Sequence, residues 1–259
     1  MKANNVLLKR LTKLGFLFVV GLSMVACAGV PSLDGSTTTW KEEVQLHDGQ
    51  KIVVKRIVTR GGRHEIGQKS NSIYESLTFN LLASNKTIKW EDKKTEDIGN
   101  SNFRPLLLDI VDNTPYLVTN PMGCLSYNKW GRPNPPYVVF KYAENQWKRI
   151  TIQELPAEFT IPNLVVNSAD TVAAKAGTNL ITATTIKDLN SSLIHQEDKT
   201  ILRESVKVGC ERLVPYGKGG WLGFDWFSDQ PNYEACSNFC EKKKVSPKDC
   251  LCNELFKGK

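Results

Sequence analysis

The stretch Val44-Gln45-Leu46-His47-Asp48-Gly49-Gln50-Lys51-Ile52-Val53-Val54 decides the fold class. Two runs of β-branched and apolar residues flank an Asp-Gly pair, and glycine accepts the positive φ that a tight hairpin turn requires. Three further pairs of runs follow along the chain, at 77–79 with 87–90, 106–111 with 116–118, and 137–142 with 147–152. The pattern predicts a mainly β fold of about eight antiparallel strands arranged as hairpins, in a sandwich, an open barrel or a partial propeller.

The pattern changes after Pro156. Short helices are expected at 170–176 and 185–193, and one more strand at 200–208. We therefore assign 40–208 to the mainly β domain. Residues 209–259 form a cysteine-rich C-terminal module that we expect to be helical and held together by disulfides.

Residues 1–26 have the composition of an export signal. Four cations and no acidic residue accompany an apolar run, 14–26, of about 13 residues, whereas a transmembrane helix needs about 20. Met24-Val25-Ala26-Cys27 resembles a bacterial lipobox, although Ala26-Cys27-Ala28 also fits ordinary secretory cleavage. We interpret 1–26 as a signal peptide and 27–39 as a lipidated cysteine followed by a flexible tether.

The cysteine count agrees with a lipid on Cys27. The chain has seven cysteines, and an exported domain usually pairs its thiols, so setting Cys27 aside leaves an even number. Lipoproteins with Asp after the acylated cysteine tend to stay on the inner membrane. Here Ala28 follows, so the expected location is the outer membrane, with the folded part facing the periplasm.

The other six cysteines are disulfide candidates. A helix over 231–244 would place two of them one turn apart on one face, and Ser246-Pro247 would begin a short turn that carries two more. If bridges join these two segments, Cys124 and Cys210 remain as the third pair, although six cysteines allow 15 connectivities. Zinc on the last four is the alternative, but oxidising conditions after export favour disulfides. The six are Cys124, Cys210, Cys236, Cys240, Cys250 and Cys252.

Charge and motifs exclude several functions. The chain has 34 basic and 27 acidic side chains, and four of the basic ones precede Cys27, which leaves 30 − 27 = +3 for the mature protein. This small excess and the predicted export argue against a nucleic-acid partner. The sequence has no GxSxG, HExxH, GxGxxG or phosphate-binding loop, so no catalytic residue, cofactor or metal is assigned. A periplasmic hydrolase is the alternative, using His64, Glu65 or Asp109.

Two segments have more aromatic residues than a solvated loop needs. The first, 123–137, contains Trp130 and Arg132, and the second, 220–227, contains four aromatic residues in a run of seven. Such residues can bind a partner protein or a glycan, or they can form the core of the small module. The candidate binding surface consists of Trp130, Arg132, Trp221, Phe224 and Trp226.

Several of these segments carry a resemblance. Leu46-His47-Asp48-Gly49, 61–67, 123–138 and 217–223 resemble the corresponding parts of a group of uncharacterised proteobacterial envelope lipoproteins. The resemblance implies an envelope location and no particular activity. Together with the anchor, it leads us to expect a non-enzymatic lipoprotein, attached to a membrane by its lipid, that binds an envelope protein or a glycan.

The anchor generates the first testable prediction. Cys27→Ala should move the protein from the membrane fraction to the soluble periplasm, because the substitution removes the thiol that carries the lipid. Labelling with an alkyne-tagged fatty acid should mark the wild type and leave the variant unmarked. An unlabelled wild type would contradict the anchor and favour cleavage after Ala28.

Overall fold

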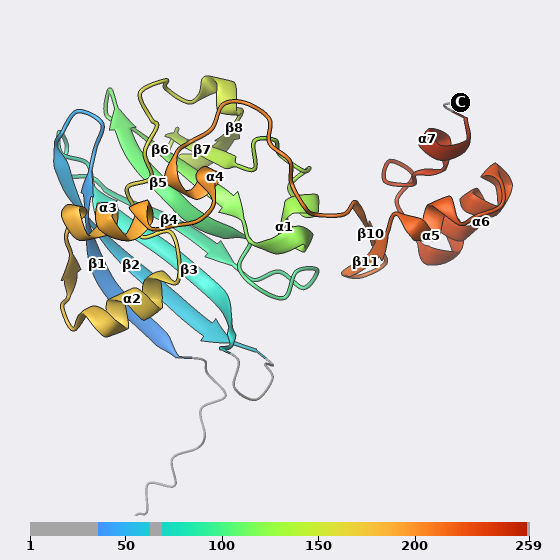
Figure 1. Cartoon of the computed structure of the whole chain (residues 1–259), viewed down its shortest axis with the longest axis horizontal. Coiled ribbons are helices and arrows are strands. Elements are labelled where there is room, and N and C mark those ends of the chain that lie inside the picture. The colour runs from blue at the N-terminus through green and yellow to red at the C-terminus, as the bar shows by residue number, and fades with distance from the viewer. Residues whose placement is uncertain (1–35, 63–68, 258–259) are drawn as a thin grey trace, which may run out of the picture. The chain divides into compact units, whose positions relative to one another are not determined.

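Two mainly antiparallel sheets form the centre of the main domain in the computed structural model, which describes residues 36–62 and 69–257 (Figure 1). The predicted signal peptide, Cys27, His64 and Glu65 lie outside the described residues. The first sheet has the order β4-β3-β2-β1-β9 and the second has the order β5-β6-β7-β8. The strands of the first are β1 (Thr37–Gln45), β2 (Lys51–Gly61), β3 (Asn71–Asn80), β4 (Thr87–Lys93) and β9 (Leu180–Ile181), which runs parallel to β1. Those of the second are β5 (Phe103–Val111), β6 (Thr114–Pro121), β7 (Val138–Ala143) and β8 (Gln146–Ile150).

The four predicted hairpins are confirmed. Val44 pairs with Ile52 across the first turn, where Gly49 has a φ of 86° and Asp48 Oδ1 accepts a hydrogen bond from the Gln50 backbone N–H at 2.9 Å. The other three hairpins are β3–β4, β5–β6 and β7–β8. Asn113 and Asn145 have φ values of 60° and 62° in the last two turns, a conformation that asparagine tolerates better than most residues.

The inner faces of the two sheets share one hydrophobic core, so of the three predicted architectures the structure has a sandwich. Alternate residues point inward on β1, β2 and β4 of the first sheet, as the residue period of two requires. The first sheet contributes Val44, Leu46, Ile52, Val54, Leu77, Phe79, Ile88 and Trp90, and the second contributes Phe103, Leu108, Leu117, Val138 and Phe140.

The rest of the domain covers the surfaces that this core leaves open. Helices α2 (Ala169–Ala176) and α3 (Ala183–Ser191) lie over β1 and β2 (Figure 1). Residues of both helices pack with Trp40 of β1 and Val58 of β2. The outer face of the second sheet packs against Phe159 and other side chains of the 155–201 segment. That segment includes α4 (Gln196–Lys199) and follows the 3₁₀ turn η1 (Ile152–Glu154).

The predicted strand at 200–208 is wrong, because the structure has no strand there. The backbone N–H groups of this segment find partners outside any strand ladder. Leu202 donates to the Tyr137 hydroxyl at 3.3 Å and Val206 donates to Asn134 Oδ1 at 2.8 Å. Ile201 is buried against the outer face of the second sheet, so the apolar residues that suggested a strand serve as packing for a loop.

The C-terminal module has a small core around two disulfides. It consists of β10 (Leu213–Tyr216), β11 (Gly220–Gly223), α5 (Asp225–Ser228), α6 (Tyr233–Lys243) and α7 (Cys252–Phe256). Disulfides join Cys236 to Cys252 and Cys240 to Cys250, so they link α6 to the following segment as expected. Asn232 caps α6, since its side chain accepts a hydrogen bond from the Ala235 N–H at 2.9 Å.

A third disulfide joins the module to the β domain. Cys124, on α1 (Gly123–Lys129), is bonded to Cys210, which is the pair expected to remain. Arg132 supports the same junction, because its guanidinium donates to the carbonyls of Cys210 and Glu211 at 2.9 and 2.7 Å. No helix among the described residues is long and apolar enough to span a membrane.

Candidate functional site

A buried arginine forms the floor of the candidate site. Arg56 lies on the inner face of β2, is only 2% exposed, and bonds two carboxylates on the neighbouring strands. Its Nη1 lies 3.0 Å from Glu42 Oε1 on β1, and its Nε and Nη2 lie 2.8 and 2.7 Å from Glu75 Oε1 on β3. The three side chains are buried together, so each charge depends on the others for its partner.

Strand register brings these charges together. Arg56 pairs with Trp40 and Leu77 across its two ladders, which places Glu42 and Glu75 on the diagonals. The guanidinium carbon lies 5.5 Å from the centre of the Trp40 ring, and the indole Nε1 donates to Glu42 Oε1 at 2.8 Å. Burial raises the pKa of Glu75, although the Arg56 guanidinium opposes this effect.

The same cluster holds the chain segment that leads into α2. Arg56 Nη1 donates to the Val165 carbonyl at 2.8 Å, and the Val165 N–H donates to Glu42 Oε2 at 3.0 Å. One ion cluster therefore fixes three strands and a segment more than 100 residues away in sequence.

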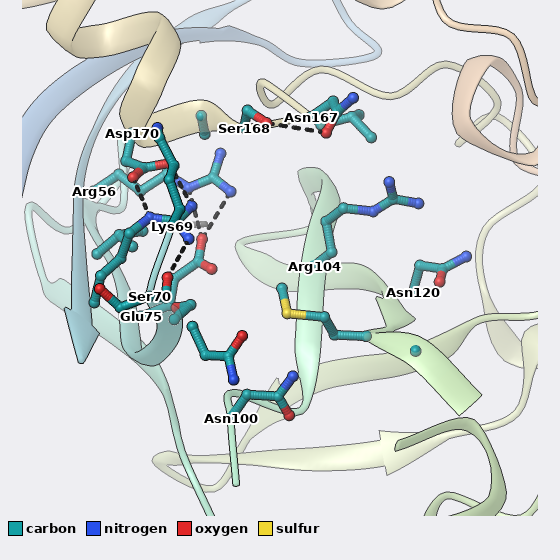
Figure 2. A pocket seen from close by; sticks show the side chains of 18 of the residues that line it. Arg56, Lys69, Ser70, Glu75, Asn100, Arg104, Asn120, Asn167, Ser168 and Asp170 are labelled. Carbon is teal, nitrogen blue, oxygen red and sulfur yellow. Dashed lines mark hydrogen bonds and ion pairs between the residues drawn. The ribbon is translucent and has the colours of Figure 1, made fainter. Parts of the chain in front are cut away.

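A polar cleft of about 430 Å³ opens beside this cluster (Figure 2). Its lining comes from β2, β3, the ends of β5 and β6, and the start of α2. Figure 2 shows Arg56, Lys69, Ser70, Glu75 and Asp170 on one side of the cleft, and Arg104 and Asn120 on the other.

The first wall is held by an ion pair with two hydrogen bonds. Arg60 Nε and Nη2 donate to Asp170 Oδ2 and Oδ1 at 2.5 and 2.9 Å, and Arg60 Nη1 donates to the Ser70 carbonyl. This arrangement lowers the pKa of the Asp170 carboxyl, so the pair stays charged at neutral pH. Lys69 donates to the Thr171 hydroxyl, next to Asp170. Arg60 does not need a ligand. Three of its five N–H groups have protein acceptors, and the partly exposed side chain lets water reach the other two.

The second wall has groups that the protein leaves without partners. Arg104 Nη2 donates to Asp198 Oδ1 at 2.5 Å, but its Nε and Nη1 have no acceptor among the described residues. The Asn120 side chain has no hydrogen-bond partner within the described part of the chain either. Asn100 Oδ1 is buried, and no described residue donates a hydrogen bond to it.

These groups suit a ligand with both donors and acceptors. Arg104 and Asn120 can donate, and Asn100 Oδ1 can only accept. The cleft is less suited to a metal ion. Within 36–62 and 69–257, the only group of three or more potential metal ligands is Cys236, Cys240 and Cys252, and each of these is in a disulfide.

The predicted aromatic surface divides into internal and exposed residues. Trp130 packs 4.6 Å from the Phe103 ring and donates from Nε1 to Asn102 Oδ1, so it belongs to the sandwich core. Trp221 Nε1 donates to the Asp97 carbonyl at 2.6 Å. Phe224 is partly buried in the core of the module, whereas Trp226 is 55% exposed.

A second cleft surrounds His47, which sequence reasoning treated as a turn residue. His47 Nδ1 lies 2.7 Å from Asp109 Oδ1, and the His47 backbone N–H donates to Asp109 Oδ2 at 2.9 Å. Asp109 is 3% exposed and the His47 ring is 24% exposed, beside a cleft of about 540 Å³. The two residues are 62 positions apart, so only the packing of the first turn on β5 brings them together.

Comparison with known proteins gives no functional assignment. The chain matches no protein-family model, no curated protein and no solved structure. The site must therefore be interpreted from its own geometry.

The His47–Asp109 contact generates a pH-dependent prediction. The hydrogen bond that the protonated His47 ring donates to the Asp109 carboxylate raises the pKa of His47 above its usual 6.5, so the contact stabilises the fold fully below pH 6.5 as long as Asp109 is ionised. This contribution is lost as the pH rises through the higher folded-state pKa. Asp109→Asn should therefore lower the free energy of unfolding by about 1 to 2 kcal/mol more at pH 5.5 than at pH 8.5.

Urea denaturation at the two pH values measures this difference. Glu158→Gln is the matched control, because Glu158 lines the same cleft and acts on His47 only through space. An equal loss of stability by Asp109→Asn at both pH values would show that His47 protonation is not coupled to Asp109.

Proposed function

We propose that this chain is a lipid-anchored protein of the bacterial envelope that acts by binding, without catalysis, and that the polar cleft beside Arg56 holds its ligand. The anchor and the periplasm-facing outer-membrane location rest on the sequence pattern around Cys27. The binding role rests on the cleft, whose lining comes from segments that are far apart along the chain.

The buried Asn100 Oδ1 is the observation that carries the proposal. A buried acceptor without a partner costs about 1 to 3 kcal/mol, so folded proteins rarely keep one. Asn100 lines the cleft, so a rotation of its amide would bring this oxygen within reach of a donor on a ligand. Arg104 and Asn120 line the same cleft and have N–H groups available for the acceptors of the same ligand.

The ligand that fits these groups is polar. A hydroxyl group donates and accepts, and a peptide group does the same through its N–H and C=O. An envelope glycan and an extended segment of an envelope protein both meet this requirement. None of the described residues that line the cleft has an aromatic side chain, so recognition by these residues depends on hydrogen bonds.

A hydrolase is the second candidate function, and the His47–Asp109 contact favours it. A carboxylate on Nδ1 orients the imidazole and leaves Nε2 to transfer a proton, as in known acid–base dyads. Among the described residues, however, no serine, threonine or cysteine side chain hydrogen-bonds to His47. The dyad thus lacks a protein nucleophile, and binding remains the preferred proposal.

Asn100→Ala separates a ligand site from a structural one. Removing an unsatisfied acceptor should leave the free energy of unfolding unchanged or raise it by about 1 kcal/mol. The same substitution should weaken binding about tenfold, which corresponds to one lost hydrogen bond. Binding is measured by co-sedimentation with purified peptidoglycan sacculi and by crosslinking to solubilised envelope proteins.

Asn238→Ala is the matched control, because Asn238 is an exposed amide on α6, outside the cleft. It should change neither stability nor binding. If Asn100→Ala instead destabilised the fold and left binding intact, Asn100 would be a structural residue and the cleft would lose its main support.

A further inference from the structure

The C-terminal module presents one exposed indole. Trp226 lies on α5 and is 55% exposed, and its Nε1–H has no acceptor among the described residues. Four of the other five tryptophans donate this N–H to the protein, and the fifth, Trp90, is buried in the sandwich core. The four acceptors are Glu42 for Trp40, Asn102 for Trp130, Lys89 for Trp147 and Asp97 for Trp221.

The ring is held in place from one side. Trp226 stacks on Phe239 with a centroid distance of 6.2 Å and an interplanar angle of 11°, and Lys243 Nζ lies 5.7 Å from the Trp226 ring. Phe239 and Lys243 are four residues apart on α6, so they lie on the same face of that helix. Two disulfides fix α6 within the module, which gives the indole a rigid support, while more than half of the Trp226 surface stays exposed.

The surroundings of Trp226 are polar. Asp225 and Asp229 flank it and are exposed, and Gln230 donates from Nε2 to the Trp226 carbonyl, which leaves its Oε1 available. The other large exposed hydrophobic residues of the described chain all lie before the module. They are Val53, Leu82, Ile161, Leu180 and Ile194.

We propose that Trp226 is a platform on which a sugar ring of an envelope glycan stacks. The apolar C–H face of a sugar covers the exposed part of the indole ring. The sugar hydroxyls accept a hydrogen bond from the indole N–H, which has no acceptor among the described residues, and donate to the carboxylates of Asp225 and Asp229. A protein partner would instead favour an anchor surrounded by other exposed apolar groups that exclude water, and among the described residues of the module Trp226 is the only large hydrophobic side chain that is exposed rather than at least partly buried. This site is separate from the cleft and goes beyond the binding role proposed for it.

A soluble oligosaccharide tests the contact directly. The probe is the trimer of N-acetylglucosamine, added to the ¹⁵N-labelled chain in its Cys27→Ala form. The six tryptophans give six indole N–H signals, and the Trp226 signal should shift most. Asn100→Ala should retain this shift, because the cleft and Trp226 are separate sites. The variant therefore distinguishes a loss of binding at the cleft from a loss of binding at Trp226.

Polymer binding identifies the source of the glycan. Co-sedimentation with peptidoglycan sacculi and with lipopolysaccharide vesicles is compared for the wild type, Trp226→Ala and Trp226→Phe. We expect Trp226→Ala to weaken binding to one of the two by about tenfold or more, and Trp226→Phe to restore part of it, because a phenyl ring still stacks.

Ile194→Ala is the control for nonspecific adhesion, since Ile194 is 90% exposed and has no ring. It should bind like the wild type. The proposal is overturned if the wild type binds neither polymer, if Trp226→Ala binds as well as the wild type, or if Ile194→Ala loses as much binding. Loss of a crosslinked protein without loss of glycan binding in Trp226→Ala would also overturn it.

Discussion

The ion cluster of Arg56 with Glu42 and Glu75 is the interaction on which the arrangement of the first sheet and its cleft depends. Three buried charges connect β1, β2 and β3, and Arg56 also bonds the Val165 carbonyl of the segment leading into α2. Buried ion pairs add little net stability, because desolvation offsets much of the attraction. Removing one partner nevertheless lowers stability strongly, because the remaining charge stays buried with neither water nor an opposite charge to stabilise it.

This constraint divides the inner face of the first sheet. One half is apolar and packs on the second sheet, and the other half carries the charges and is covered by α2 and α3. A further buried carboxylate, Asp92 on β4, accepts hydrogen bonds from the Phe103 N–H and the Asn102 side chain at 2.8 and 3.0 Å. The polar cleft lies where the part covered by the second sheet meets the part covered by α2 and α3. Its position therefore follows from the placement of charged residues within the strands.

Most of the local structure could be predicted from sequence, although not the loop at 200–208, whereas the two clefts could not, and only Asp109 and Trp226 of their site residues and of the exposed indole site were among the predicted candidates. The turn at Asp48-Gly49 and the bridges of Cys236 and Cys240 to the next segment join residues that are close in sequence, so local patterns specify them. The His47–Asp109 contact depends on how a turn packs on another sheet, which local patterns do not specify. One signal was available for the cluster: strand alternation places Arg56 on the same inward face as Ile52 and Val54, where a charge requires a partner.

The measurement that tests the ion cluster most directly is the free energy of unfolding of Arg56→Met and of the triple variant Arg56→Met/Glu42→Gln/Glu75→Gln. The single substitution should lower it by about 3 to 5 kcal/mol, because it leaves two carboxylates buried without a cation. The triple variant should recover most of this loss, since no charge remains within the Arg56–Glu42–Glu75 cluster. A single variant within about 1 kcal/mol of the wild type would contradict a cluster of mutually dependent buried charges.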